Sequence, residues 1–275
     1  MLEKLLQLTG WDKPEKKDVA LVLSSGGARG LAHIGAIEEL ERRGYRIRSV
    51  TGCSMGALVG GMYAAGRLGE FVEWMRTVNR RKIFSLLDLT LSTSHLVKGN
   101  RVIESLQEIL PDVPIETLPV LYRAVATDWE KGCEVVFSGG SLYRAIRASI
   151  SIPGFFSPVP RGETVLVDGA VLNPLPLKEA LTMPGDLLVA VNVSGPLLPE
   201  ESGTGFNYLT MLRRTLLMMQ QRMAALTAEI CKPDVLVDIP MNLVGAFDFD
   251  RTDEIAAIGR EGMRKALDEY EKKRR

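Results

Sequence analysis

The stretch Thr51-Gly52-Cys53-Ser54-Met55-Gly56-Ala57 joins a β-like run over residues 45–51 to a helical run over residues 55–65. A Gly-x-Ser-x-Gly string at such a junction is typical of a nucleophile elbow, where a strand ends, a helix begins and a serine lies exposed at the bend. Gly52 and Gly56 have no Cβ atoms to clash in so tight a turn. The following helix directs its N-terminal N–H groups at the serine, where they stabilise developing negative charge. Taken alone, the motif also fits an ordinary turn of small residues.

A second turn of small residues precedes this one. Val19-Ala20-Leu21-Val22-Leu23 is a continuous apolar run, which predicts a strand buried on both faces of a parallel sheet. Apolar residues then recur at helical spacing over residues 31–44, and a further strand over residues 47–50 leads into the serine turn. The order strand, loop, helix, strand, turn and helix indicates an α/β fold with a parallel sheet.

The loop Gly26-Gly27-Ala28-Arg29-Gly30 follows the first of these strands and permits two interpretations. A dinucleotide-binding fingerprint would need glycine at position 25, which is serine, and an acidic residue at the end of the next strand, which is missing. A phosphate-binding Walker loop would need a closing Gly-Lys-Ser/Thr, which is also missing. The favoured interpretation is an oxyanion hole, because consecutive small residues let backbone N–H groups converge on one oxygen. Arg29 would either fix this loop through hydrogen bonds or meet an anionic head group.

The remaining pattern predicts one α/β domain over residues 18–275, preceded by a short amphipathic helix and connector over residues 1–17. The irregular apolar segment 83–98 is either a substrate-entry flap or a buried loop. Further elements follow from periodicity, with strands at 120–127, 134–137, 164–167, 187–193 and 235–239, and helices at 69–80, 101–110, 141–148, 207–231 and 253–270. In the helix at 207–231, a stripe of leucine and methionine predicts a face that fills the core, with a lipid-adaptable surface as the alternative.

The composition restricts the classes of function. Lys+Arg and Asp+Glu balance at 34 each, which argues against nucleic acid as a partner. Three scattered cysteines and two histidines predict no disulfide framework, no metal site and no other cofactor. No run of about 18 apolar residues is present, so we expect a cytoplasmic protein or one held peripherally at a membrane. The sequence does not predict an oligomeric state.

A serine nucleophile needs a base, and histidine is poorly placed to supply it. The usual order of serine, acid and histidine is impossible because no histidine follows His95. His33 lies in the helix after the glycine loop, where packing is its expected role. A carboxylate acting directly on the serine is the economical solution, and Asp168 ends the apolar strand at 164–167. Asp128 and Asp88 are less well placed, and Asp168 considered alone would be interpreted as a structural cap.

Three motifs stand together in this chain, and their order and spacing resemble those of the patatin-like phospholipases, in particular compact bacterial members. They are Gly26 to Gly30, Gly52 to Gly56, and Asp168-Gly169-Ala170. The resemblance extends over residues 18–195 and includes the strings Gly30-Leu-Ala-His-Ile-Gly-Ala36, Ala145-Ile-Arg-Ala-Ser149, Ile152-Pro-Gly154 and Asp168 to Pro176. One departure is Ser25, which stands where such families usually have a third glycine.

This resemblance implies a three-layer α/β/α sandwich with a central, mostly parallel sheet. It implies a Ser–Asp dyad, with Ser54 as nucleophile and Asp168 as general base, within the acid loop that includes Gly169 and Ala170. The implied oxyanion hole uses the N–H groups of Gly26, Gly27, Ala28, Arg29, Gly30 and Met55. The implied reaction is metal-free hydrolysis of acyl esters in phospholipids or lysophospholipids through an acyl-serine. Two alternatives are acyl transfer from the same acyl-serine and a non-catalytic, lipid-binding regulatory protein.

Overall fold

The computed structural model describes residues 17–78, 100–197 and 207–274. The short amphipathic helix predicted near the N-terminus, at residues 2–8, and the segment 83–98, interpreted as either a flap or a buried loop, lie outside this part of the chain. The division into residues 1–17 and 18–275 therefore stays a prediction.

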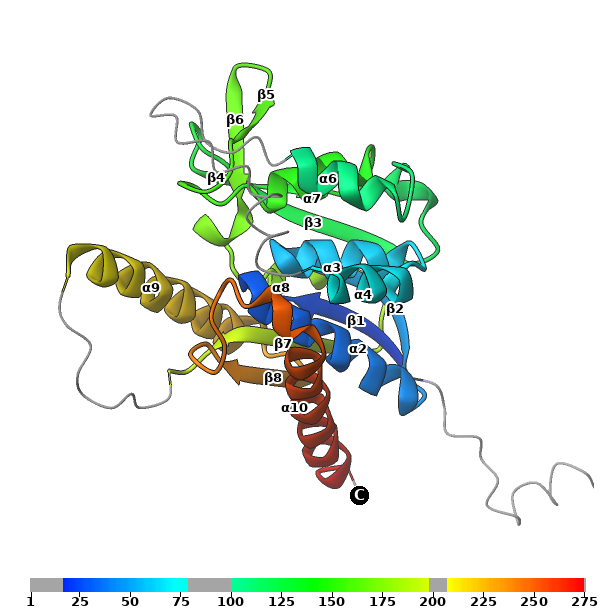
Figure 1. Cartoon of the computed structure of the whole chain (residues 1–275). Helices are drawn as coiled ribbons and strands as arrows, with labels where there is room; N and C mark the ends of the chain where they lie inside the picture. The colour runs from blue at the N-terminus through cyan, green and yellow to red at the C-terminus, as the bar shows by residue number, and fades with distance from the viewer. Residues whose placement is uncertain (1–16, 79–99, 198–206, 275) are drawn as a thin grey trace, which may run out of the picture.

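A mixed sheet of eight strands forms the centre of the described structure (Figure 1). Its order is β5-β6-β3-β2-β1-β7-β8, and β4 pairs with β3. The strands β3, β2, β1, β7 and β8 are parallel, whereas β4, β5 and β6 pair in antiparallel fashion. The bounds are β1 Asp18–Leu23, β2 Arg46–Cys53, β3 Leu121–Asp128, β4 Cys133–Phe137, β5 Val159–Arg161, β6 Thr164–Asp168, β7 Leu187–Gly195 and β8 Val235–Pro240.

Helices cover both faces of this sheet, so the predicted three-layer α/β/α sandwich is confirmed. Successive side chains of β1 point to opposite faces of the sheet. Leu21 and Leu23 belong to the larger apolar core on one face, and Val22 belongs to a second core on the other face. One face carries α2 Ala32–Arg42, α3 Met55–Ala64, α4 Leu68–Arg76, α6 Asn100–Gln107, α7 Leu142–Ser149 and α10 Thr252–Lys272. The other face carries α8 Leu177–Ala180 and α9 Tyr208–Cys231.

The predicted elements recur with small shifts in their ends. The strand predicted at residues 19–23 is buried along its whole length, as a strand covered on both faces must be. The sequence did not predict β5 or α8, which are only three and four residues long. The short η1 Gly27–Leu31, a 3₁₀ helix, also occupies most of the predicted glycine loop.

The interpretation of α9 as a core-filling helix was wrong. Ala224 is its one fully buried residue among the side chains that the structure describes, and five apolar side chains of its N-terminal half are exposed: Met211, Leu212, Leu216, Met218 and Met219. Helical periodicity identifies an apolar face but does not say what that face contacts. None of the described helices combines the length and the apolar character needed to cross a membrane.

Candidate active site

The serine turn has the geometry of a nucleophile elbow. β2 ends at Cys53, α3 begins at Met55, and Ser54 between them has φ 54° and ψ −122°. A positive φ is strained for a residue with a Cβ atom, and such strain is concentrated at functional sites. A Cβ atom on Gly56 would lie 2.3 Å from the carbonyl oxygen of Leu23, so only glycine fits there. Residues 52–56 thus form a tight strand-to-helix turn of the shape that a nucleophile elbow requires.

A second serine, Ser149, holds this turn in place. Its Oγ accepts a hydrogen bond from the Ser54 N–H at 2.8 Å and donates one to the carbonyl oxygen of Val125 at 2.7 Å. Ser149 is buried at the end of α7 and so connects the elbow to β3. The sequence predicted no role for Ser149. Its one signal was its place at the end of the family-like string Ala145 to Ser149, where the helix breaks.

Asp168 reaches Ser54 because of the order of the strands. β3 lies between β2 and β6, and the antiparallel pairing of β6 brings Asp168 opposite Ala126, near the carboxyl end of β2. Ser54 Oγ donates a hydrogen bond of 2.6 Å to Asp168 Oδ2. The other carboxylate oxygen, Oδ1, accepts one from the Ala170 N–H at 2.8 Å. This second contact fixes the orientation of the carboxylate toward the serine.

Burial determines the acidity of this carboxyl group. Asp168 is 3% exposed, and removal from water raises its pKa from 3.8 to about 6. Hydrogen bonds from Ser54, Ala170 and Cys53 favour the ionised form and oppose this rise in pKa, but desolvation is the larger effect. The Cys53 thiol lies 3.9 Å from Asp168 Oδ1. A carboxylate with a pKa near 6 is ionised at neutral pH and is a better proton acceptor than an exposed aspartate.

Two buried side chains hold the glycine loop beside the elbow. The ring nitrogen Nε2 of His33 lies 2.8 Å from the carbonyl oxygen of Ser24, and burial lowers the pKa of His33 to about 4, so the ring is neutral. Arg29 Nε donates to the carbonyl oxygen of Gly26 at 3.0 Å, and its Nη1 donates to that of Met241 at 2.7 Å. Of the two roles considered for Arg29, the structure therefore shows loop fixation. Burial lowers the pKa of Arg29 to about 10, which leaves it cationic at neutral pH.

Hydrogen bonds within the loop distinguish the candidate oxyanion donors. Ala28 N–H donates to the carbonyl oxygen of Ala246 at 2.9 Å, and the 3₁₀ helix engages the N–H groups of Arg29 and Gly30. Within the described part of the chain, the predicted donors whose N–H groups have no acceptor are Gly26, Gly27 and Met55.

The other candidate bases contact other partners or fall outside the described residues. His33 contacts the backbone of Ser24, and Asp128 accepts hydrogen bonds from Thr164 Oγ1 and the Lys131 N–H. His95 and Asp88 fall in the part of the chain that is not described. In the described ranges, no group of three or more His, Cys, Asp or Glu side chains is arranged to hold a metal ion.

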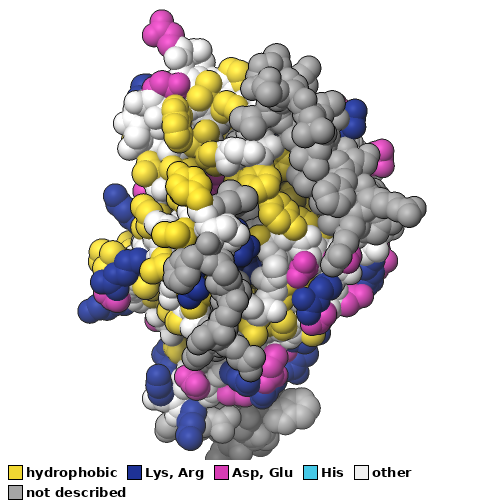
Figure 2. Space-filling model, turned by 60° about the vertical axis from the view of Figure 1, so that its left-hand side comes forward, with side chains coloured by type: hydrophobic (Ala, Val, Ile, Leu, Met, Phe, Trp, Pro, Cys, Tyr) yellow, Lys and Arg dark blue, Asp and Glu magenta, His cyan; other side chains and the backbone are white. Residues whose placement is uncertain are grey.

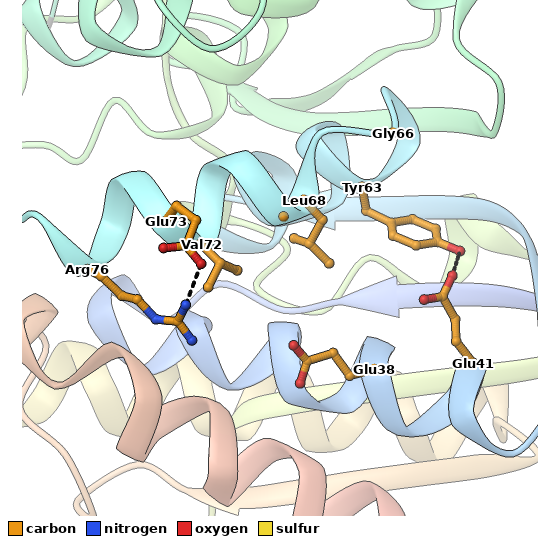
Figure 3. A pocket seen from close by; sticks show the side chains of 9 residues that line it. Glu38, Glu41, Tyr63, Gly66, Leu68, Val72, Glu73 and Arg76 are labelled. Carbon is orange, nitrogen blue, oxygen red and sulfur yellow. Dashed lines mark hydrogen bonds and ion pairs between the residues drawn. The ribbon is translucent and has the colours of Figure 1, made fainter.

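A surface pocket on another side of the molecule contains none of these residues. It is formed by α2, α3 and α4, and Figure 3 shows Glu38 and Glu41 facing Tyr63, Val72 and Arg76 across it. The Tyr63 hydroxyl donates to Glu41, and Arg76 pairs with Glu73. Glu38 pairs with Arg260 of α10, so each charged side chain that lines this pocket already has a partner, and the Ser54 site remains the stronger candidate.

Replacing Ser149 by alanine tests whether the elbow depends on this support. Ser149→Ala leaves the Ser54 N–H and the Val125 carbonyl without their partner, and we expect the free energy of unfolding to fall by about 1–3 kcal/mol. We also expect ester hydrolysis to fall, because Ser54 is no longer held in its strained conformation. Denaturant unfolding and kcat on a soluble ester measure the two effects.

Ser49→Ala is the matched control for this experiment. Ser49 is buried on β2, the strand that leads into the elbow, and its hydroxyl donates a single hydrogen bond, to the carbonyl oxygen of Pro184 at 2.8 Å. Ser49→Ala should therefore lower the free energy of unfolding without changing kcat. Equal loss of kcat in both variants would mean that Ser149 acts only on overall stability.

The fold and the site define a class of protein: an α/β protein that carries a buried serine at a nucleophile elbow, hydrogen-bonded to an aspartate. The model of the patatin-like phospholipase family matches residues 21–181, which is more than half of the chain. The chain therefore belongs to the patatin-like phospholipase family, and the predicted resemblance is confirmed.

Similar proteins agree with this assignment. An uncharacterized NTE family protein of Mycobacterium tuberculosis is 44% identical over 69% of this chain and 52% of its own length. The mouse patatin-like phospholipase domain-containing protein 6 is 33% identical over 64% of this chain and 13% of its own length. The crystal structure of VipD from Legionella pneumophila matches the fold with a TM-score of 0.50, at 14% identity over 94% of this chain and 67% of that one. The chain spans about half the length of the mycobacterial relative.

Proposed function

We propose that this protein is a serine hydrolase that cleaves acyl esters of lipids, with Ser54 as nucleophile and Asp168 as general base. The observation that carries the proposal is the hydrogen bond of 2.6 Å from Ser54 Oγ to Asp168 Oδ2, at an elbow where both side chains are buried. A serine hydroxyl needs a base within hydrogen-bond reach, and this carboxylate supplies one without an intervening histidine.

The proposed reaction has two steps. In the first, Ser54 Oγ attacks the ester carbonyl carbon as its proton passes to Asp168. Protonated Asp168 then gives that proton to the departing alcohol, and an acyl-Ser54 remains. In the second, Asp168 takes a proton from water, the resulting hydroxide attacks the acyl-serine, and the proton returns to Ser54 as the fatty acid leaves.

The negative charge that develops on the carbonyl oxygen needs hydrogen-bond donors. The N–H groups of Gly26, Gly27 and Met55 support this role, because they have no acceptor within the described residues. Met55 is also the first residue of α3, whose N-terminus favours negative charge. Preorganised donors of this kind contribute several kcal/mol to catalysis, about 3–4 for a single donor.

The family supports a lipid or lysophospholipid as substrate, and peripheral contact with a membrane is the expected route to it. The direct test is mass spectrometry of lipid extracts incubated with the wild-type protein and with Ser54→Ala. Free fatty acid and the matching deacylated lipid should accumulate only with the wild type. Added glycerol distinguishes hydrolysis from acyl transfer, because a transferase would form new acyl glycerols. Lack of labelling of Ser54 by a fluorophosphonate would favour a non-catalytic, lipid-binding protein.

The raised pKa of Asp168 predicts a specific dependence on pH. Asp168 must be ionised to accept the serine proton, so kcat/KM should fall about tenfold per pH unit below an apparent pKa of about 6 and level off above it. Initial rates with a soluble ester between pH 4.5 and pH 8, with circular dichroism to verify folding at each pH, measure this. A rate that is independent of pH across this range would contradict Asp168 as the base.

A further inference from the structure

Helix α9 extends past the edge of the sheet that carries the active site. It has 24 residues and is therefore about 36 Å long, whereas the six-residue β8 that follows spans about 20 Å. α9 connects the carboxyl end of β7 to the amino end of β8, so its surplus length projects from the carboxyl edge. Figure 1 shows the N-terminal half of α9 reaching away from the body of the molecule.

The projecting half exposes a large apolar surface. Met211, Leu212, Leu216, Met218 and Met219 are between 46% and 56% exposed. On the face turned forward in Figure 2, hydrophobic side chains form a broad band with Lys and Arg side chains beside it. Contiguous exposed apolar surface of this kind marks an interaction site.

This surface continues to the candidate active site. Gln220 Nε2 of α9 donates a hydrogen bond of 3.4 Å to the carbonyl oxygen of Ala170 in the acid loop. The charge of Arg213 on α9 also contributes to lowering the pKa of Arg29, so the two guanidinium groups lie within electrostatic range of each other. Three exposed apolar side chains belong to the same region. Leu172 donates its N–H to the carbonyl oxygen of Gly169 in the acid loop, and Phe247 follows Ala246, which accepts from the Ala28 N–H of the glycine loop. The ring of Phe155 lies against that of Phe247, with centroids 5.1 Å apart.

The charge of the helix identifies the partner. Residues 208–228 contain Arg213, Arg214 and Arg222 and no acidic residue. Arg222 lies 3.6 Å from Glu229 in the C-terminal half of α9, whereas Arg213 and Arg214 belong to the projecting half together with the exposed leucines and methionines. Exposed leucine and methionine beside arginine is the pattern that binds an anionic membrane surface, with the apolar side chains among the acyl chains and the arginines at the phosphates.

We propose that the N-terminal half of α9, with Phe155, Phe247 and Leu172, docks the protein on an anionic phospholipid bilayer and brings Ser54 to its substrate. The choice of a bilayer as occupant rests on the proposed function. Docking on a bilayer requires only that the adaptable apolar side chains of this surface enter the lipid, without a matching protein surface opposite them. It also places these side chains next to the site where a lipid substrate must enter.

Vesicle binding by the Ser54→Ala protein tests this proposal, because it needs no turnover. Co-sedimentation should be at least about tenfold stronger with phosphatidylcholine vesicles containing about one third phosphatidylglycerol than with pure phosphatidylcholine. In that background, Leu216→Ser/Met219→Ser and Arg213→Gln/Arg214→Gln should each weaken binding to the anionic vesicles at least about tenfold. Binding without lipid hydrolysis by the wild type would overturn the proposed function alone, whereas hydrolysis without binding would overturn the docking surface alone.

Matched controls separate docking from general loss of hydrophobicity or charge. Leu121 and Leu181 are 53% and 57% exposed, like Leu216 and Met219, but lie toward the amino ends of the strands. Leu121→Ser/Leu181→Ser and Lys272→Gln/Lys273→Gln should bind as the parent does. Equal binding to both kinds of vesicle, or full binding by the α9 variants, would overturn the proposal. Concentration-dependent dimerisation that Leu216→Ser/Met219→Ser abolishes, without vesicle binding, would assign the surface to a second copy of the chain.

Discussion

Ser54→Ala is expected to reduce ester hydrolysis by at least about 10⁴-fold and to abolish labelling by a fluorophosphonate. The reason is chemical, since the acyl group in the proposed reaction is carried by Ser54 Oγ, and among the described residues no other hydroxyl hydrogen-bonds to Asp168. Hydrolysis of a p-nitrophenyl ester and gel-based probe labelling measure the two losses. Retention of even one tenth of the activity would place the nucleophile elsewhere.

A second variant at the same position separates catalysis from folding. Ser54 has φ 54°, a conformation that costs about 1–3 kcal/mol for a residue with a Cβ atom and almost nothing for glycine. Ser54→Gly should therefore be equally inactive but more stable than Ser54→Ala. If both variants were inactive and unstable, loss of fold would explain the result for Ser54→Ala.

Much of this fold follows from local sequence patterns. Runs such as residues 19–23 identify buried parallel strands, and Gly52 and Gly56 identify a tight turn, because few other residues fit these environments. The candidate site could also be predicted from the sequence, because its residues lie at strand ends and because three motifs occur together in the chain. Their roles as nucleophile, base and oxyanion donors remain proposals.

Contacts between distant segments were the part that sequence could not supply. The support of Ser54 by Ser149 joins residues 95 positions apart, and no periodicity encodes it. The donation from Ala28 to Ala246 likewise depends on a loop more than two hundred residues later. The exposure of α9 was missed for a related reason, since an apolar stripe has the same spacing whether it faces a core or projects beyond the sheet.

Asp168→Asn is expected to remove about 10⁴-fold of the activity while leaving the protein more stable than the wild type above pH 7. The amide can keep both hydrogen bonds, with its oxygen accepting from the Ala170 N–H and its nitrogen donating to Ser54 Oγ. It cannot accept the serine proton, so activity falls for a chemical reason.

The gain in stability follows from the pKa of the buried acid. Burial raises the pKa of Asp168 from 3.8 to about 6, so the folded protein holds a proton that the unfolded chain releases between these values. The contribution of Asp168 to the free energy of unfolding is therefore complete below pH 3.8 and is lost as the pH rises through about 6. The loss is on the order of 2–3 kcal/mol, and asparagine, which does not ionise, avoids it.

Denaturant unfolding of the wild type and Asp168→Asn at pH 5 and pH 8 tests this argument, since the difference in stability should be larger at pH 8. Asp128→Asn is the control, because hydrogen bonds from Thr164 and Lys131 lower the pKa of that buried carboxylate. Removing the Asp128 carboxylate should therefore lower the free energy of unfolding at pH 8. An Asp168→Asn protein that is inactive and less stable than the wild type at pH 8 would mean that the ionised carboxylate is mainly structural. An inactive protein that is more stable than the wild type at pH 8 would support Asp168 as the base. It would mean that the ionised carboxylate lowers the free energy of unfolding and is needed for proton transfer.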